Sequence, residues 1–364
     1  MELADGRKRM CAIRGRAAAV LFGRKRVSEL WKNYGSIPVV PAADPTPGKA
    51  FAGEISEQKG TLSVSDLKIA LSSLVDRQNN IPKEVFPMTF PIVLCHGVCR
   101  FDQFWSDTLG LDNNNDPTKD LLHYFKGIRT MLVEKGFTVF HSRVPWAATV
   151  DERAEALRAG LERILRDSDA AKVNIIAHSM GGLDARHMLF NDRHSGKIHE
   201  RIASLTTIST PHWGSPFADW GIRNVGDVIP ICGNLGLDIK AFRDLTVAAC
   251  SQFNQLQAVM DFEKACEDNI RFQTYACRQD FIGVFTPLKL SYYFIEKQEG
   301  DNDGLVSVRS AKWQGRFFKD TLENTDHFNA LGWWDAGQIW VRESRRKLLE
   351  RIHGVYAGIA RELP

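Results

Sequence analysis

The sequence lacks both a hydrophobic run long enough to cross a membrane and a paired-cysteine motif. The apolar stretches Phe90–Leu94 and Ile175–Ala177 are soon interrupted by polar residues or glycine, far short of the ~18 consecutive apolar residues of a membrane helix. The seven cysteines are odd in number and include no C-x-x-C pair, which argues against a disulfide framework. We therefore expect neither a membrane-spanning helix nor a disulfide-stabilised small domain.

A large excess of charge is also missing from most of the chain. The net charge is +3, and residues 1–26 contain eight Lys or Arg against Glu2 and Asp5, so this segment carries +6 and the remainder −3. No zinc-finger or RNA-binding signature accompanies the basic segment. A basic nucleic-acid face across the body of the protein is not indicated, and we expect no nucleic-acid partner.

The basic first segment itself lacks the apolar centre of a secretory signal, because Ala17–Phe22 is only a short patch between arginines. An Arg-rich amphipathic start is typical of mitochondrial presequences, although Glu2 and Asp5 count against that interpretation. A polybasic arm on anionic lipid, at about 1 kcal/mol per basic residue, and a solvated tail are the alternatives. We assign residues 1–35 as a targeting segment or membrane-surface arm.

The sequence predicts two further parts. Residues 36–85 are assigned as a linker rich in Pro and Gly, followed by a short helix whose apolar residues recur at near-helical spacing over Ser65–Arg77. With 44% hydrophobic and 25% charged residues the chain has the balance of a globular protein. We assign residues 86–364 as its catalytic domain.

Short β-type runs alternate with helical patterns through this domain. The predicted strands are Phe90–Cys95, Thr138–Val144, Lys172–Ala177, Ile202–Ser209, Arg271–Ala276 and Tyr292–Glu296, and the predicted helices are Asp120–Lys135, Asp151–Arg166, Gly181–Phe190 and Ala336–Ala360. Such alternation predicts an α/β fold, a mainly parallel sheet with helices on both faces. Between about 216 and 268 the pattern is helical without strands, an insertion of the kind that covers a site as a lid.

The clearest local signal is the segment Val173–Gly182, an apolar strand, a turn centred on Ser179 and then a helix. A nucleophile elbow needs small residues two before and two after the serine, because the strained turn brings strand and helix close together. Gly181 meets this need, and Ala177 replaces the usual first glycine. An ordinary strand-to-helix turn is the alternative interpretation.

An earlier strand that ends in His96-Gly97 strengthens the nucleophile interpretation. A tight turn there presents the amide of Val98, and the amide after the nucleophile belongs to Met180. Two such amides form the oxyanion hole of an acyl-transfer enzyme. We therefore predict Val98 and Met180 as the oxyanion residues.

A serine nucleophile also needs a base that is oriented by an acid. Asp303 lies in a turn sequence after the predicted strand Tyr292–Glu296, and His327 follows 24 residues later, in the order Ser, Asp, His that this fold uses. Asp301 and Asp326 are the lesser candidates for the acid. Each residue alone has a plain surface or turn interpretation, so the prediction depends on their order and context together.

Together these motifs resemble the triacylglycerol lipases of the α/β-hydrolase superfamily, in the Pseudomonas-like bacterial branch and the related fungal mitochondrial lipases. The resemblance covers roughly residues 86–350 and rests on His96-Gly97, Ala177–Gly182, Ser209–Pro216, Asn302–Val306 and Asp326-His327. It implies an α/β-hydrolase fold with a helical lid at about 216–268, with Ser179 as nucleophile, Asp303 as acid and His327 as base. It also implies a lipase that hydrolyses acylglycerol esters at a lipid–water interface.

Several alternatives stay open at this point. A phospholipase or acyltransferase would use the same triad, and a non-catalytic scaffold would bind lipid or a partner. The resemblance also implies a structural calcium site, in which the bacterial lipases use an aspartate two residues after the base. Asn329 occupies that position here, and its amide supplies no charge for calcium, so we expect no cofactor. Peripheral contact with a membrane or lipid droplet is expected, and localisation to the mitochondrion, with the cytoplasm or lipid-droplet surface as alternatives.

Overall fold

The computed structural model describes most of the predicted catalytic domain. The described residues are 90–98, 120, 123–145, 148–194, 196–224, 239–335 and 345–364. The predictions for residues 1–35 and 36–85, and for the first part of the last helix, lie outside these residues. Within the described part, no helix has the length and apolar character needed to span a bilayer.

Within the described residues, six strands form one parallel sheet in the order β2-β1-β3-β4-β5-β6. Their bounds are β1 Ile92–Cys95, β2 Val139–His141, β3 Val173–His178, β4 Ile202–Ile208, β5 Arg271–Cys277 and β6 Phe318–Leu322. Every residue of β1, β3 and β4 is buried, as expected for central strands covered on both faces. The predicted fold class, a parallel sheet with helices, is confirmed.

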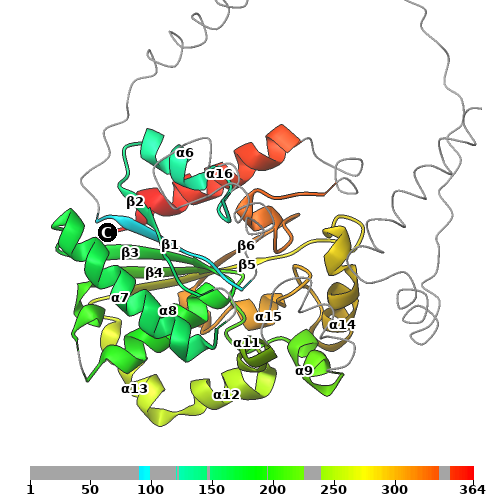
Figure 1. The fold of residues 1–364 in the computed structure, drawn as a ribbon. Coiled ribbons are helices and arrows are strands. Elements are labelled where there is room, and N and C mark those ends of the chain that lie inside the picture. The colour runs from blue at the N-terminus through cyan, green and yellow to red at the C-terminus, as the bar shows by residue number, and fades with distance from the viewer. Residues whose placement is uncertain are drawn as a thin grey trace, which may run out of the picture. The chain divides into compact units, whose positions relative to one another are not determined.

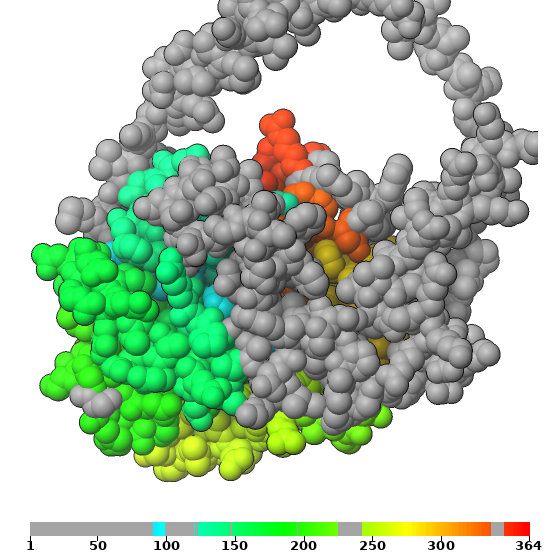
Figure 2. Space-filling model, viewed as in Figure 1, coloured from blue at the N-terminus to red at the C-terminus, as the bar shows by residue number. Residues whose placement is uncertain are grey.

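Helices cover both faces of this sheet (Figure 1). Their bounds are α6 Ile128–Glu134, α7 Val150–Ser168, α8 Met180–Asp192, α9 Pro216–Arg223, α11 Ile239–Asp244, α12 Val247–Gln255, α13 Gln257–Cys266, α14 Lys289–Glu299, α15 Val308–Ala311 and α16 Arg345–Glu362. Helices α6 and α16 lie on one face, and α7 and α8 on the other. In the same view, Figure 2 shows the green-to-yellow part of the chain, which includes α7, α8, α12 and α13, as one continuous lower surface.

The core is divided between these two faces by the alternation of side chains along the strands. Ile92 and Leu94 pack with α6 and α16 in one cluster, whereas Val93 and Cys95 pack with α7 and α8 in another. Helix α7 begins at a capping box in which Thr149 and Glu152 bond each other's backbone amides. This capping box stabilises the first turn of α7.

Three elements differ from the sequence prediction. The helix predicted over Asp120–Lys135 begins only at Ile128, because Gly127 before it has a left-handed backbone with φ 67°. The predicted strand over Tyr292–Glu296 is wrong, because this segment lies inside helix α14, which buries Ser291, Tyr292 and Ile295 on one side. Strand β6 was not predicted, because its side chains are half-buried or exposed at the sheet edge and give no apolar run. In the predicted insertion the described residues form α9, α11, α12 and α13, and residues 225–238 lie outside the description.

Candidate active site

Ser179 occupies a strained turn between β3 and α8. Its backbone has φ 57° and ψ −134°, a conformation that is costly for a residue with a side chain and that clusters at functional sites. Two hydrogen bonds hold this turn: the Ser179 amide donates to Ile208 O at 3.0 Å, and Thr210 Oγ1 donates to Ser179 O at 2.8 Å. The sheet and the next loop therefore fix the serine at the carboxyl end of the central strand.

The glycines around this serine allow close backbone approach. A Cβ at Gly181 would lie 2.6 Å from Cys95 O and 2.8 Å from His96 O, and a Cβ at Gly97 would lie 2.6 Å from the Ser179 Cβ. No side chain fits at such distances. The start of α8 therefore lies directly against the turn after β1, which is the turn predicted to supply the first oxyanion amide.

His327 and Asp303 form a buried pair. His327 Nδ1 donates to Asp303 Oδ2 at 2.8 Å, and the other carboxylate oxygen, Oδ1, accepts from the amides of Leu305 at 2.9 Å and Val306 at 2.7 Å. Both side chains are almost fully buried. An ionised carboxylate can only accept, so the proton of the neutral imidazole sits on Nδ1. His327 Nε2 is therefore the nitrogen that can accept a proton.

The ring of His327 lies beside the elbow. Its centroid is 4.5 Å from that of His178, the residue before Ser179. His178 Nδ1 lies 2.7 Å from the hydroxyl of Tyr124. Burial, together with the repulsion of His327, holds the pKa of His178 well below its usual range. A neutral His178 therefore contacts both the His327 ring and the Tyr124 hydroxyl. The segments that carry Ser179, Asp303 and His327, which are remote in the sequence, thus meet in one region.

The two predicted oxyanion residues also lie together. Val98 packs against the cluster formed by Val150, Met180, Leu183 and Cys250. Met180 is the first residue of α8, and the first amides of a helix have no partner within that helix. The amide of Met180 thus lies next to Ser179 at the positive end of a helix, the kind of position that suits a developing negative charge.

The two lesser candidates for the acid have other partners. Asp301 is exposed and its Oδ1 lies 3.3 Å from Arg278 Nε. The Asp326 carboxylate is buried and accepts the amides of Phe285 at 2.7 Å, Phe328 at 2.9 Å and Asn329 at 2.7 Å. Asp303 is thus the carboxylate that faces the Nδ1 of the predicted base.

Asp326 gives a pH dependence of stability. Burial raises its pKa to about 7, from an ordinary value of 3.8, against the opposing effect of the three backbone amides. The folded state therefore binds more protons than the unfolded state between about pH 4 and pH 7, so this group's contribution to the free energy of unfolding falls as pH rises through that window. The Asp326→Asn variant lacks this titrating group, so this pH-dependent loss of stability is absent from it. Denaturant unfolding at several pH values should therefore show that the free energy of unfolding of the variant, minus that of the wild type, increases from about pH 4 to pH 7.

The exposed Asp301→Asn variant is the matched control for this measurement and should follow the wild-type profile. Parallel profiles for the wild type and Asp326→Asn would contradict the burial argument.

The residues near the base do not fit the calcium site that the resemblance brings. Asn329 Oδ1 accepts from the Asp326 amide at 3.3 Å, and Asn329 Nδ2 donates to Trp333 O at 2.9 Å. Calcium takes six to eight oxygen ligands, with carboxylates supplying the charge. The Asn329 amide is neutral and the Asp326 carboxylate already accepts three amides, so these side chains stabilise the loop directly.

Sequence reasoning missed a buried ion pair that joins the elbow to the oxyanion turn. Arg153 of α7 is fully buried, and its Nη2 donates to Asp184 Oδ2 of α8 at 2.6 Å and to His96 O at 2.9 Å. Its Nη1 donates to Pro145 O at 2.6 Å. The arginine therefore fixes the turn before Val98 relative to α8. The sequence did not reveal the burial of Arg153, because an arginine in an amphipathic helix normally indicates the solvated face.

Replacing this arginine should destabilise the fold strongly. Arg153→Met leaves the Asp184 carboxylate buried and unpaired, which costs about 3–5 kcal/mol of the free energy of unfolding. Denaturant unfolding measures this loss. The double variant Arg153→Met with Asp184→Leu removes both charges and should regain most of the stability, yet its ester hydrolysis stays impaired because His96 O has lost its donor. A single variant as stable as the wild type would contradict this account.

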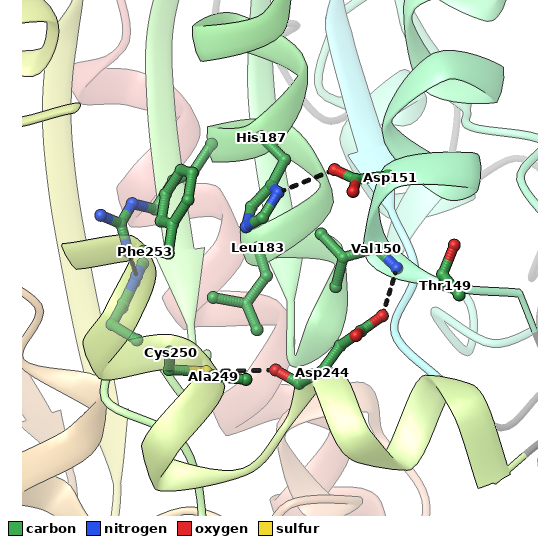
Figure 3. Close-up of a pocket in the computed structure, with 11 residues that line it drawn as sticks. Thr149, Val150, Asp151, Leu183, His187, Asp244, Ala249, Cys250 and Phe253 are labelled. Atoms are coloured by element: carbon green, nitrogen blue, oxygen red, sulfur yellow. Dashed lines mark hydrogen bonds and ion pairs between the residues drawn. The ribbon is translucent and has the colours of Figure 1, made fainter. Parts of the chain in front are cut away.

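A cavity of about 200 Å³ lies beside the elbow, between the start of α7, α8 and α12 (Figure 3). Leu183 and Cys250 line it and also pack with Met180. On its polar side His187 Nδ1 lies 3.1 Å from Asp151, and Asp244 accepts from the amide of Val150 at 2.8 Å. It is smaller than the roughly 300–1,000 Å³ of pockets for drug-sized ligands, so it does not by itself provide a substrate site.

The described cysteines are poor alternative nucleophiles. Cys95, Cys250, Cys266 and Cys277 are free and buried. Burial raises the pKa of the Cys95 and Cys250 thiols to about 12, so the reactive thiolate is scarce at neutral pH. Among the described side chains, Ser179 therefore remains the nucleophile candidate.

Known proteins resemble parts of this chain. The model of a PGAP1-like alpha/beta domain matches residues 146–230. Triacylglycerol lipase 2 of Saccharomyces cerevisiae is 30% identical over 295 residues, which cover 70% of this chain and 83% of the yeast protein. A triacylglycerol lipase of Pseudomonas fragi is 33% identical over 130 residues, which are 36% of this chain and 37% of that protein. The match to this bacterial relative thus spans little more than a third of its length.

Solved structures support the fold. Lipase 1 from Pelosinus fermentans superposes with a TM-score of 0.51 at 17% identity, covering 76% of this chain and 100% of that one. A metagenomic carboxyl esterase gives a TM-score of 0.53 at 16% identity, covering 76% and 77%.

The fold and the relatives define a serine ester hydrolase of the α/β-hydrolase class. The strained serine turn at Ser179 lies within residues 146–230, which the domain model matches, and the buried His–Asp pair follows further along the chain. The chain belongs to the triacylglycerol lipase family.

Proposed function

We propose that this protein hydrolyses the ester bonds of acylglycerols, with Ser179 as nucleophile, His327 as base and Asp303 as orienting acid. The observation that carries the proposal is the 2.8 Å bond from His327 Nδ1 to Asp303 Oδ2, with the His327 ring beside the residue that precedes Ser179. The similarity to triacylglycerol lipase 2 of yeast supports the substrate class.

The chemistry follows from this arrangement. Ser179 Oγ attacks the acyl carbonyl carbon while His327 Nε2 takes its proton, and the amides of Val98 and Met180 stabilise the negative oxygen. The imidazolium then gives its proton to the departing alcohol, and the acyl-enzyme remains. Water attacks the acyl-enzyme in the same way, Ser179 regains its proton, and a fatty acid leaves. Asp303 stays ionised throughout and stabilises the imidazolium.

The nearest rival to this proposal is a phospholipase or acyltransferase with the same residues. A phospholipase differs in the head group of its substrate, and an acyltransferase differs in the acceptor of the acyl group. The purified protein is incubated separately with triolein, with phosphatidylcholine, and with triolein plus an acceptor alcohol. Release of fatty acid from triolein supports the proposal. Release from phosphatidylcholine alone, or acyl transfer to the alcohol without net hydrolysis, would overturn it in favour of the rival.

Contact with a lipid surface is the second part of the proposal. Two apolar side chains of the α12–α13 segment, Leu256 and Met260, are 47% and 41% exposed, whereas Trp220 of α9 is buried against Phe217 and Phe294. We propose that the insertion at 216–268 acts as a lid that meets a membrane or lipid droplet through such exposed apolar groups. Co-flotation with a triolein emulsion on centrifugation tests this, and protein that stays in the aqueous phase would contradict it.

The mitochondrion is the proposed location. Its support is the net charge of +6 on residues 1–26, since an Arg-rich, acid-poor segment is what mitochondrial import recognises. A fluorescent reporter fused to residues 1–35 tests this proposal. A diffuse cytosolic signal, or one on lipid droplets, would overturn it.

A further inference from the structure

A cluster of metal-ligating side chains lies apart from the Ser179 elbow. It consists of Asp120, His123 and His141, whose ligand atoms all lie within 4.8 Å of one another. His141 is the last residue of the edge strand β2, while Asp120 and His123 precede α6 in the sequence. The cluster thus joins the edge of the sheet to the segment that leads into α6.

Contacts within the cluster position these side chains. Asp120 Oδ2 accepts from the amide of Thr130 at 2.8 Å, which directs Oδ1 toward His141 Nε2 at 3.4 Å. The ring of His123 stacks on that of His141 with centroids 3.6 Å apart. Hydrogen bonds that orient a ligating carboxylate in this way are the usual outer support of protein metal sites.

The three side chains supply two imidazoles and one carboxylate. Two imidazoles and one carboxylate are a ligand set for zinc, with the fourth position left for water.

We propose that Asp120, His123 and His141 form a zinc-binding site that ties the end of strand β2 to the segment before α6. Neighbouring ligand atoms around a tetrahedral zinc ion with bonds of about 2.0–2.1 Å lie about 3.3 Å apart. Asp120 Oδ1 and His141 Nε2 already have nearly this spacing. The ring of His123 has to leave its stack on His141 to complete the site.

Zinc at this position also supports the wall of the active-site region. Tyr124 follows His123 directly, and its hydroxyl lies 2.7 Å from His178 Nδ1. A Cβ at Gly97 would lie 2.8 Å from the same hydroxyl, so Tyr124 packs tightly against the turn before Val98. The metal would act as a structural anchor for Tyr124, and it takes no part in the ester chemistry.

Zinc binding to the full chain, without a histidine affinity tag, tests the proposal directly. The protein is stripped with a chelator, dialysed and titrated with ZnCl₂ in competition with a chromophoric chelator. We expect one zinc ion that depends on the cluster. Loss of a direct ligand in His141→Gln or His123→Gln should weaken its binding by at least about 100-fold, since disturbing even the outer support of a metal site costs 10–100-fold. Zinc should raise the melting temperature of the wild type and leave that of these variants unchanged.

The matched control is His199→Gln, because His199 Nδ1 bonds Asp192 Oδ2 at 2.9 Å in another His–Asp pair. It should bind zinc like the wild type. The half-buried His123 provides the second variant if His141→Gln fails to fold. No zinc bound by the wild type, or equal affinity in the wild type and the two cluster variants, would overturn the proposal. Ester hydrolysis is not the readout, so this result is independent of the proposed function.

Discussion

Ser179→Ala should lose about 10⁶-fold in turnover on an acylglycerol ester while keeping its fold. Losses of this size follow removal of a serine nucleophile, because the acyl-enzyme can no longer form. The side chain makes little structural contribution, since the hydrogen bonds that hold the turn use the backbone amide and carbonyl of Ser179. Alanine keeps the Cβ that lies against Gly97. Initial rates on triolein, together with the melting temperature, measure both halves of this prediction.

Ser168→Ala is the matched control for this substitution. Ser168 ends α7, and its hydroxyl donates to Ile164 O within that helix, so its loss should leave turnover within about twofold of the wild type. An unchanged rate in Ser179→Ala would contradict the mechanism and favour a non-catalytic role for the elbow.

Asp303→Asn should lose about 10⁴-fold in turnover, the size of effect seen when the orienting acid of a serine triad becomes an amide. The amides of Leu305 and Val306 both donate to Oδ1, so the oxygen of the new amide stays there and its NH₂ group takes the place of Oδ2. That group can only donate, and it forces His327 Nδ1 to become an acceptor. The ring proton then sits on Nε2, which can no longer receive the proton of Ser179.

Asp301→Asn separates this effect from a general loss of negative charge. Asp301 lies two residues away, is exposed and pairs with Arg278 at the surface, where an ion pair contributes little. Its turnover should stay within about twofold of the wild type. Comparable losses in both variants, or near-normal turnover in Asp303→Asn, would show that the acid has been assigned to the wrong residue.

The parts of the fold that the sequence predicted are those with strong local patterns. The apolar runs around Ile92 and Ile175 suit the buried centre of a sheet, and the strands that contain them are fully buried. The segment Tyr292–Glu296 was predicted as a strand because aromatic and β-branched residues favour strands. It forms part of helix α14, which buries Ser291 and Ile295 on one side. Strand β6 was not predicted because an edge strand with exposed side chains has no distinctive hydrophobic periodicity.

The candidate site also has parts that could be predicted from the sequence and parts that could not. The elbow and the order of Ser179, Asp303 and His327 are local or sequential signals, so a single sequence carries them. The resemblance already placed Asp303 ahead of Asp301 and Asp326, and the hydrogen bond from His327 Nδ1 to Asp303 Oδ2 agrees with that choice. The partnership of Arg153 with Asp184 depends on how two helices pack on the sheet, and the convergence of Asp120 with His141 depends on a strand end. No spacing rule in the sequence reveals such contacts.

Reaction with a fluorophosphonate ester, followed by mapping of the modified residue, is the most direct test of the central claim. The reagent modifies only a serine whose proton is removed by a correctly oriented base. The account predicts a single stoichiometric adduct on Ser179, formed in the wild type and in Asp301→Asn, and formed far more slowly in Asp303→Asn. An adduct on another residue, or no adduct on a protein that hydrolyses triolein, would contradict it.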